Sequence, residues 1–250
     1  MYSKVNSFLR TVFFAVFVSC LAAGCAGNKG GRADTAESPA AEASYVSEVF
    51  PLERAGIDLH LDCMKLEGTE PEKNILLVHG VTYSSHEFDI NYEDYSLVRK
   101  LAREGYGVWR LDIAGFGESE EVSDGFLPDS DYAAEDIAAA VDLISSETGQ
   151  EKIDVLGWSW GTVTAGRFAA SHPEHLDQLV LYAPILCGIG EYEVEDPYLD
   201  YDLVNTALED LPEGSELEMI EGGSHAVLVE KPYYRDFQDR LVRYLEKQPD

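Results

Sequence analysis

Strand-like and helix-like segments alternate along most of this chain, and that order constrains its fold more than any other feature. Continuous apolar runs such as Asn74–His79 predict strands covered on both faces, whereas Asp131–Ser146 carries apolar residues at helical spacing. Strands separated by helices pair in parallel. We therefore predict an α/β domain over residues 45–250, with a doubly wound, mostly parallel sheet and reactive residues at the carboxyl ends of its strands.

The bounds of the individual strands and helices are predicted from the spacing of apolar residues and from the glycine and proline residues that interrupt them. The predicted strands are Tyr45–Leu52, Gly56–Glu67, Asn74–His79, Val108–Ile113, Lys152–Gly157, Gln178–Tyr182 and Glu216–Ile220. The predicted helices are Tyr92–Arg103, Asp131–Ser146, Trp160–Ser171, Asp200–Leu211 and Tyr233–Glu246. A turn at Glu53–Gly56 joins the first two strands into a hairpin.

The N-terminus has the pattern of an export signal. Residues 11–23 are almost wholly apolar but too short for a comfortable membrane span of about 20 residues. Leu21-Ala-Ala-Gly-Cys25 resembles the lipobox of bacterial lipoproteins, with Ala22 in place of the usual Leu. That resemblance implies a signal peptide over residues 1–24 and a lipid on Cys25. An ordinary signal peptide with an incidental Cys25 is the alternative.

Residues 25–44 predict a flexible tether, because Gly, Ala, Ser and Pro dominate and no apolar period appears. We expect the protein to be exported and anchored by the lipid on Cys25 to a bacterial membrane, facing the periplasm or the exterior. The net charge is −29, with 47 acidic residues against 18 Lys and Arg. Such a surface repels phosphate backbones, so we expect no nucleic-acid partner.

Gly157-Trp-Ser159-Trp-Gly161 is the strongest chemical motif. It lies between a predicted strand and a predicted helix, the context of a nucleophile elbow. There the serine occupies a strained turn that points its hydroxyl out of the sheet, and glycine on both sides avoids collisions with neighbouring backbone. We predict that Ser159 is a nucleophile; a glycine-rich connection without chemistry is the alternative.

A serine hydroxyl needs a base, and His225 is the best candidate. It follows the strand Glu216–Ile220 on a loop at the strand's carboxyl end, and it is the last histidine in the chain. The order serine, acid, histidine requires this placement. His79 is interpreted as structural, shaping the turn after its strand, and His86 lies on a loop that could approach the site.

These motifs together resemble the α/β-hydrolase superfamily. The resemblance rests on His79-Gly80, on Asp112-Ile-Ala-Gly-Phe-Gly-Glu-Ser119, on the elbow, and on Gly222-Gly-Ser-His225-Ala, over roughly residues 45–250. It implies an oxyanion hole formed by the backbone N–H groups of Val81 and Trp160, which would stabilise the developing negative charge.

The triad acid has two candidates in the stretch Glu191-Tyr-Glu193-Val-Glu195-Asp196. Asp196 has the separation from His225 that is usual in the superfamily, whereas Glu193 fits the Gly-Glu-Tyr-acid pattern at the end of the acid-bearing strand. We prefer Asp196. An acidic loop without catalytic function is the alternative.

One interval departs from the superfamily. Only 13 residues separate the strand ending at Tyr182 from Asp196, where relatives place a helix, often a lid, and a further strand. Either the sheet has lost a strand or the chain is a shortened version of a longer relative. We expect an absent or much reduced lid and an open site.

Three functions fit these residues. The first is a hydrolase of carboxylic esters or related acyl substrates, including amides and thioesters, in which Trp158, Trp160, Tyr83 and Phe88 either wall an apolar pocket or pack in the core. The second is a catalytically inactive surface protein, and the third is a peptidase of the proline-iminopeptidase type. We expect a small-molecule acyl substrate, no cofactor and no metal, since His and Cys are not spaced as ligands. The sequence leaves the oligomeric state and the pairing of Cys63 with Cys187 open.

Overall fold

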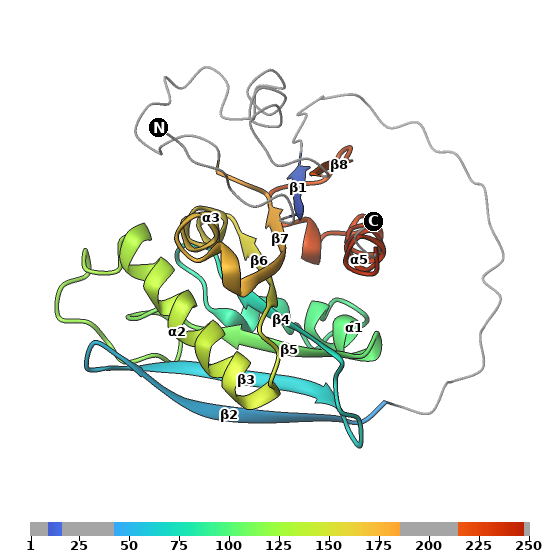
Figure 1. Ribbon diagram of the computed structural model, residues 1–250. Helices are drawn as coiled ribbons and strands as arrows, with labels where there is room; N and C mark the ends of the chain where they lie inside the picture. Colours follow the sequence, from blue (N-terminus) through green and yellow to red (C-terminus); the bar gives the residue numbers. More distant parts are fainter. Residues whose placement is uncertain (1–9, 17–42, 186–214, 248–250) are drawn as a thin grey trace, which may run out of the picture.

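The computed structural model describes residues 10–16, 43–185 and 215–247. In this part of the chain an eight-stranded sheet has the order β2-β3-β5-β4-β6-β7-β1-β8, with helices on both faces (Figure 1). The strands are β1 (Arg10–Val16), β2 (Tyr45–Arg54), β3 (Ile57–Leu66), β4 (Lys73–Val78), β5 (Tyr106–Leu111), β6 (Ile153–Trp158), β7 (Leu176–Tyr182) and β8 (Glu216–Ile220). The helices are α1 (Leu97–Arg103), α2 (Ser130–Thr148), α3 (Trp160–Ser171) and α5 (Tyr234–Leu245), with 3-10 turns η1 (Ser85–Phe88), η2 (Pro173–His175) and η3 (Val227–Val229).

The predicted doubly wound, mostly parallel sheet is confirmed. β4 pairs in parallel with β5 and β6, and β6 pairs in parallel with β7. β2 and β3 form the predicted antiparallel hairpin, and β3 joins β5 antiparallel. The carboxyl ends of β4, β5 and β6 therefore open onto the same edge, where the loops after these strands meet.

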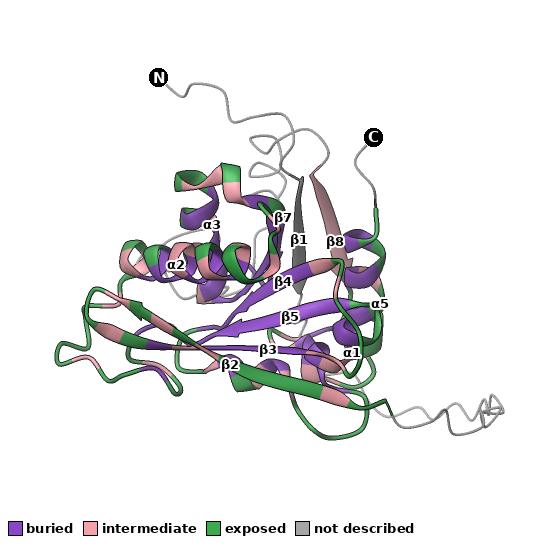
Figure 2. Ribbon diagram, turned by 60° about the horizontal axis from the view of Figure 1, so that its bottom comes forward, coloured by how far each residue is buried: buried purple, intermediate pink, exposed green. Residues whose placement is uncertain are grey.

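Two hydrophobic cores lie on opposite faces of the sheet. One lies between the sheet and the helices α1 and α5, and the other between the sheet and α2 and α3. β4, β5 and β6 are buried along nearly their whole length, whereas β2 is largely exposed (Figure 2). The continuous apolar runs of the sequence thus correspond to strands that are covered on both faces.

The helix predicted over Tyr92–Arg103 begins later, at Leu97, so the first part of that prediction was wrong. The hydroxyl of Ser96 accepts a hydrogen bond from the N–H of Arg99 at 3.0 Å and caps the helix there. Upstream, Glu93 has a φ of 47°, a left-handed conformation that a right-handed helix does not include. Apolar residues keep a helical spacing through this turn, so their pattern does not show where the helix begins.

β1 lies inside the segment predicted as a signal peptide. Its backbone pairs in parallel with β7 on one side and β8 on the other, from Arg10 opposite Gln178 to Val16 opposite Ile220. Between β7 and β8 along the chain, residues 186–214 lie outside the described part, and they include the predicted helix Asp200–Leu211. In the sheet, β1 lies directly beside β7. The short interval after Tyr182 left no obvious strand for this position.

Within the described residues no lid domain covers the carboxyl edge of the sheet. In the same residues, none of the helices combines the length and the hydropathy needed to cross a membrane.

Candidate active site

The turn between β6 and α3 holds Ser159 in a strained conformation. Its φ of 55° and ψ of −119° are rare for a residue with a side chain, and they turn the hydroxyl away from the strand. The Ser159 N–H donates to the carbonyl of Tyr182 at 3.1 Å, which fixes the turn against the neighbouring strand. The backbone of Ser159 is therefore strained, and its hydrogen bond to β7 holds it in this conformation.

The two flanking glycines are required by contact distances. A Cβ atom on Gly157 would lie 2.1 Å from the carbonyl oxygen of Gly161, and one on Gly161 would lie 2.5 Å from the carbonyl oxygen of Val78. Neither distance is possible for real atoms, and both neighbours are backbone that cannot rotate away. The backbone around the elbow therefore leaves no room for a Cβ atom at either glycine of the motif.

Ser159 and His225 lie within hydrogen-bond distance of each other. The Nε2 atom of His225 is 2.9 Å from the Oγ atom of Ser159. With its proton on Nδ1, the imidazole accepts the serine proton at Nε2, which is the arrangement a general base needs.

The backbone of His225 is held by two side chains at the ends of neighbouring strands. The indole N–H of Trp158 and the hydroxyl of Tyr182 each donate to the His225 carbonyl at 3.0 Å. The same Tyr182 hydroxyl accepts the N–H of Leu228 at 3.1 Å. The histidine loop is therefore fastened to β6 and β7, the strands that also position Ser159. No local sequence pattern marks this role of Trp158 and Tyr182.

The electrostatic environment favours neutral His225. Partial desolvation lowers the pKa of its imidazole below the ordinary value of 6.5. The neutral form, which can accept a proton, is then the main form at neutral pH.

The loop after β4 approaches Ser159 closely. A Cβ atom on Gly80 would lie 3.1 Å from the Cβ of Ser159, so glycine fits best at this point. His79 shapes the turn through both of its ring nitrogens: Nδ1–H donates to the Gly80 carbonyl at 2.8 Å, and Nε2 accepts the N–H of Ile113 at 3.1 Å. Burial lowers the pKa of His79, so the ring stays neutral and can make both bonds.

Val81 follows Gly80 on this loop, and Trp160 is the first residue of α3. The N–H groups in the first turn of a helix have no acceptor within the helix. The N–H of Trp160 and that of Val81 are the two proposed oxyanion donors.

Glu87 is a half-buried carboxyl group beside this loop that the sequence did not single out. Its Oε1 atom accepts the N–H of Gly80 at 3.2 Å, and its Oε2 atom is buried with no hydrogen-bond partner among the described residues. Burial, with a smaller contribution from the charge of Asp112, raises the pKa of Glu87 to about 9. With this pKa, the side chain is a neutral carboxylic acid at pH 7.

Asp112 connects two loops of this edge. Its carboxylate is fully buried and accepts the N–H of Ser85 at 2.6 Å and that of Glu118 at 2.8 Å. The motif Asp112–Ser119 therefore supports the loop after β4 rather than the reacting atoms.

The remaining predicted residues fall in three groups. Asp196 and Glu193, the two candidates for the triad acid, lie outside the described residues, as do Cys25 and Cys187. His86 is exposed and its Nε2 lies 3.3 Å from Glu118, so the structure does not bring it to Ser159. Cys63 is a buried free thiol.

The four aromatic residues named as candidate pocket walls have different positions. Phe88 and Trp158 are buried in the core, which supports the packing alternative for these two. Tyr83 is exposed, with its ring centroid 5.1 Å from that of Trp158. Trp160 donates its indole N–H to the hydroxyl of Ser130 at 3.1 Å. Only Tyr83 among the four offers a largely exposed ring near the elbow.

In the part of the chain that the structure describes, no group of three or more His, Cys, Asp and Glu side chains is arranged to hold a metal ion.

Residues 73–191 match the protein family described as alpha/beta hydrolase fold. Among solved structures, a predicted CIB-like hydrolase from Thermoplasma acidophilum superposes with a TM-score of 0.62 at 21% identity, covering 81% of this chain and 99% of that one. At this identity the likeness shows the fold alone.

Curated relatives match over about half of this chain. A poly(3-hydroxyalkanoate) polymerase subunit PhaC from Haloarcula marismortui is 28% identical over 159 residues, 59% of this chain and 32% of the relative. A proline iminopeptidase from Elizabethkingia meningoseptica is 27% identical over 125 residues, 50% of this chain and 39% of the relative. The human serine hydrolase BPHL is 28% identical over 151 residues, 59% of this chain and 45% of the relative. The matched region thus spans less than half the length of each of these relatives.

Proposed function

We propose that this chain, which has the α/β-hydrolase fold, is a serine hydrolase of carboxylic esters or related acyl substrates. The observation that carries the proposal is the 2.9 Å contact between His225 Nε2 and the hydroxyl of Ser159, made by a serine in the strained elbow conformation. A strained nucleophile in contact with a base is the arrangement that acyl transfer requires.

The reaction would proceed in two stages. Ser159 Oγ attacks the substrate carbonyl while His225 Nε2 accepts the hydroxyl proton, and the N–H groups of Val81 and Trp160 stabilise the oxyanion. His225 then gives the proton to the leaving alcohol, which departs and leaves an acyl-Ser159 ester. A water molecule, deprotonated by His225, attacks that ester and releases the carboxylic acid and free Ser159.

We propose Asp196 as the acid that accepts the Nδ1–H of His225, with Glu193 as the alternative. Its task would be to hold the imidazole in the tautomer whose Nε2 is free to accept a proton. The support for either residue is its position in the sequence.

A peptidase of the proline-iminopeptidase type is the second candidate, supported by the match to a proline iminopeptidase over half of the chain. Turnover of p-nitrophenyl esters of increasing acyl length, compared with L-proline p-nitroanilide, separates the two. Ester turnover lost in Ser159→Ala supports the first function. Turnover of the anilide alone supports the second, and no turnover of either by the folded protein supports an inactive surface protein.

We also propose export and lipid anchoring, on the sequence of residues 1–25 alone. Removal of residues 1–24 would remove β1 from the sheet, leaving β7 and β8 without the strand that pairs with both. The intact mass of the protein purified from a bacterial membrane tests this. A mass beginning at Cys25 with an added diacylglycerol supports the proposal, and a chain that keeps residues 10–16 contradicts it.

A further inference from the structure

A cavity that Ser159 and His225 do not line lies at the edge of the sheet opposite the carboxyl ends of β4, β5 and β6. It has a volume of about 570 Å³, within the range of small-molecule sites. β2, β3, the start of β4 and the end of α2 contribute to its walls. Asn74, in the cavity wall, lies near the start of β4, and His79 follows the end of the strand, about 16 Å away at strand spacing. The cavity is therefore separate from the proposed hydrolytic site.

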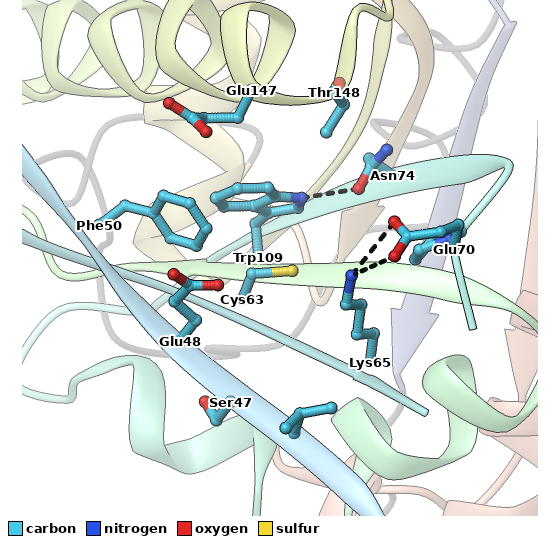
Figure 3. Close-up of a pocket in the computed structure, with 12 residues that line it drawn as sticks. Ser47, Glu48, Phe50, Cys63, Lys65, Glu70, Asn74, Trp109, Glu147 and Thr148 are labelled. Atoms are coloured by element: carbon cyan, nitrogen blue, oxygen red, sulfur yellow. Dashed lines mark hydrogen bonds and ion pairs between the residues drawn. The ribbon is translucent and has the colours of Figure 1, made fainter. Parts of the chain in front are cut away.

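The floor of this cavity is aromatic. The ring centroids of Phe50 and Trp109 lie 4.6 Å apart, with the two planes inclined at 47°. Trp109 is fixed by a hydrogen bond from its indole N–H to Asn74 Oδ1 at 2.7 Å, drawn as a dashed line in Figure 3. Trp109 is only 2% exposed, so the accessible part of this floor is mainly the partly buried ring of Phe50, which packs on Trp109. An aromatic ring held in this way packs against the apolar body of a ligand, and its face attracts cations.

The charges around the floor are predominantly negative. Lys65 is the basic residue among those that line the cavity. Both carboxylate oxygens of Glu70 lie 3.3 Å from its Nζ atom, so its charge is paired. Glu48 and Glu147 also line the cavity, and neither has an ion-pair partner among the described residues. In Figure 3 their carboxylates are drawn below and above the Phe50 and Trp109 rings.

The end of α2 adds to this negative potential. Glu147 and Thr148 are the last residues of a 19-residue helix, whose C-terminal carbonyl groups carry a partial negative charge. The last turn of α2 contains no basic residue that would offset it.

A covalent ligand does not suit this cavity. Cys63 is the thiol in its wall, and burial, together with the charge of Asp62, raises its pKa to about 12. The thiol is therefore protonated and weakly reactive at neutral pH. What the cavity offers is a rigid aromatic floor with two unpaired carboxylates.

We propose that this cavity binds an organic cation, an ammonium group attached to an apolar or aromatic body. The body packs on Phe50, which Trp109 supports from the core, and the ammonium group is attracted by the exposed carboxylates of Glu48 and Glu147 and by the ring face. Because the cavity and the elbow share no residue, binding here does not depend on the proposed hydrolase activity.

Calorimetric titration of the full-length protein with benzyltrimethylammonium tests the proposal, with benzyl alcohol and benzoate as neutral and anionic controls. We expect saturable binding with a Kd on the order of 1 mM or below at low salt. We expect benzyl alcohol to bind about tenfold more weakly and benzoate not to bind. Equal binding of benzyl alcohol, or no saturable binding of the cation up to about 20 mM, overturns the proposal.

Variants locate the binding in this cavity. The double variant Glu48→Gln, Glu147→Gln should bind the cation about tenfold more weakly, whereas Asp142→Asn, on the exposed side of α2 outside the cavity, should leave binding unchanged. Ester turnover, if present, should be the same in all three proteins. Unchanged binding in the double variant, or competitive inhibition of ester turnover by the cation, contradicts the assignment to this cavity.

Discussion

The Nε2 atom of His225 lies 2.9 Å from the Oγ atom of Ser159, although 66 residues separate them in the chain. Two anchors produce this contact. The strained turn after β6 presents the serine, and the ends of β6 and β7 hold the histidine backbone through Trp158 and Tyr182. The same two strands therefore position both reacting groups.

The pH dependence of turnover should report His225. Only the neutral imidazole accepts the serine proton, so kcat/KM should rise with pH as the ring loses its proton. Because desolvation lowers the pKa of His225, the midpoint of this rise should lie below pH 6.5. An ester assay from pH 4 to pH 9 measures it, and a midpoint clearly above 6.5 would show that a carboxylate facing His225, such as the proposed Asp196, raises its pKa more than desolvation lowers it.

Substitution of the triad acid should separate the two candidates. Asp196→Asn should lower kcat by about 10⁴-fold if Asp196 orients His225, by analogy with the model triad. Glu193→Gln should then cause little change, and it serves as the matched control. The reverse pattern assigns the acid to Glu193, and small, equal losses in both variants rule out an acid from this stretch.

The elbow glycines should tolerate no side chain. Gly157→Ala and Gly161→Ala each place a Cβ atom within 2.5 Å of a backbone oxygen, and we expect losses of about 2 kcal/mol or more in the free energy of unfolding. Gly166→Ala is the matched control on α3, because a Cβ there meets nothing within 4 Å. Helix propensity predicts that it stabilises the protein by about 0.5–1 kcal/mol. Urea unfolding of the three variants compares them, and similar stabilities would refute the steric argument.

The half-buried acid Glu87 should make stability depend on pH. Its folded-state pKa of about 9 is above the unfolded value of 4.5, so between these two pH values the folded protein keeps a proton that the unfolded chain releases. This contribution is fully present below pH 4.5 and is lost as the pH rises toward 9. Glu87→Gln keeps an acceptor for the Gly80 N–H but cannot ionise.

We therefore expect Glu87→Gln to gain stability relative to the original protein as the pH rises from 5 to 9, in urea unfolding at each pH. Glu121→Gln, at an exposed position, is the control and should show no such trend. A difference between Glu87→Gln and the original protein that stays constant with pH would show that Glu87 is ionised in the folded state.

Much of the fold and the centre of the site followed from local sequence. The apolar runs predicted the strands because buried parallel strands need apolar residues on both faces, and α3 and β8 have the predicted bounds. The spacing of Gly157, Ser159 and Gly161 predicted the elbow, because only glycine fits beside the backbone atoms that the structure places there.

Other features depend on contacts that no local pattern encodes. The bonds from Trp158 and Tyr182 to the His225 carbonyl join three separate elements, and Glu87 lies in a 3-10 turn without any periodic signal. The apolar run at Arg10–Val16 has the composition of both a signal peptide and a buried strand, and the structure pairs it with β7 and β8.

The most direct test of the central claim is intact-mass labelling of the full-length protein with a fluorophosphonate, with Ser159→Ala as the matched control. An activated serine should take up one adduct, and the variant should take up none, because its elbow lacks the hydroxyl that His225 contacts. No adduct on the folded original protein, or equal labelling of Ser159→Ala, would contradict the account.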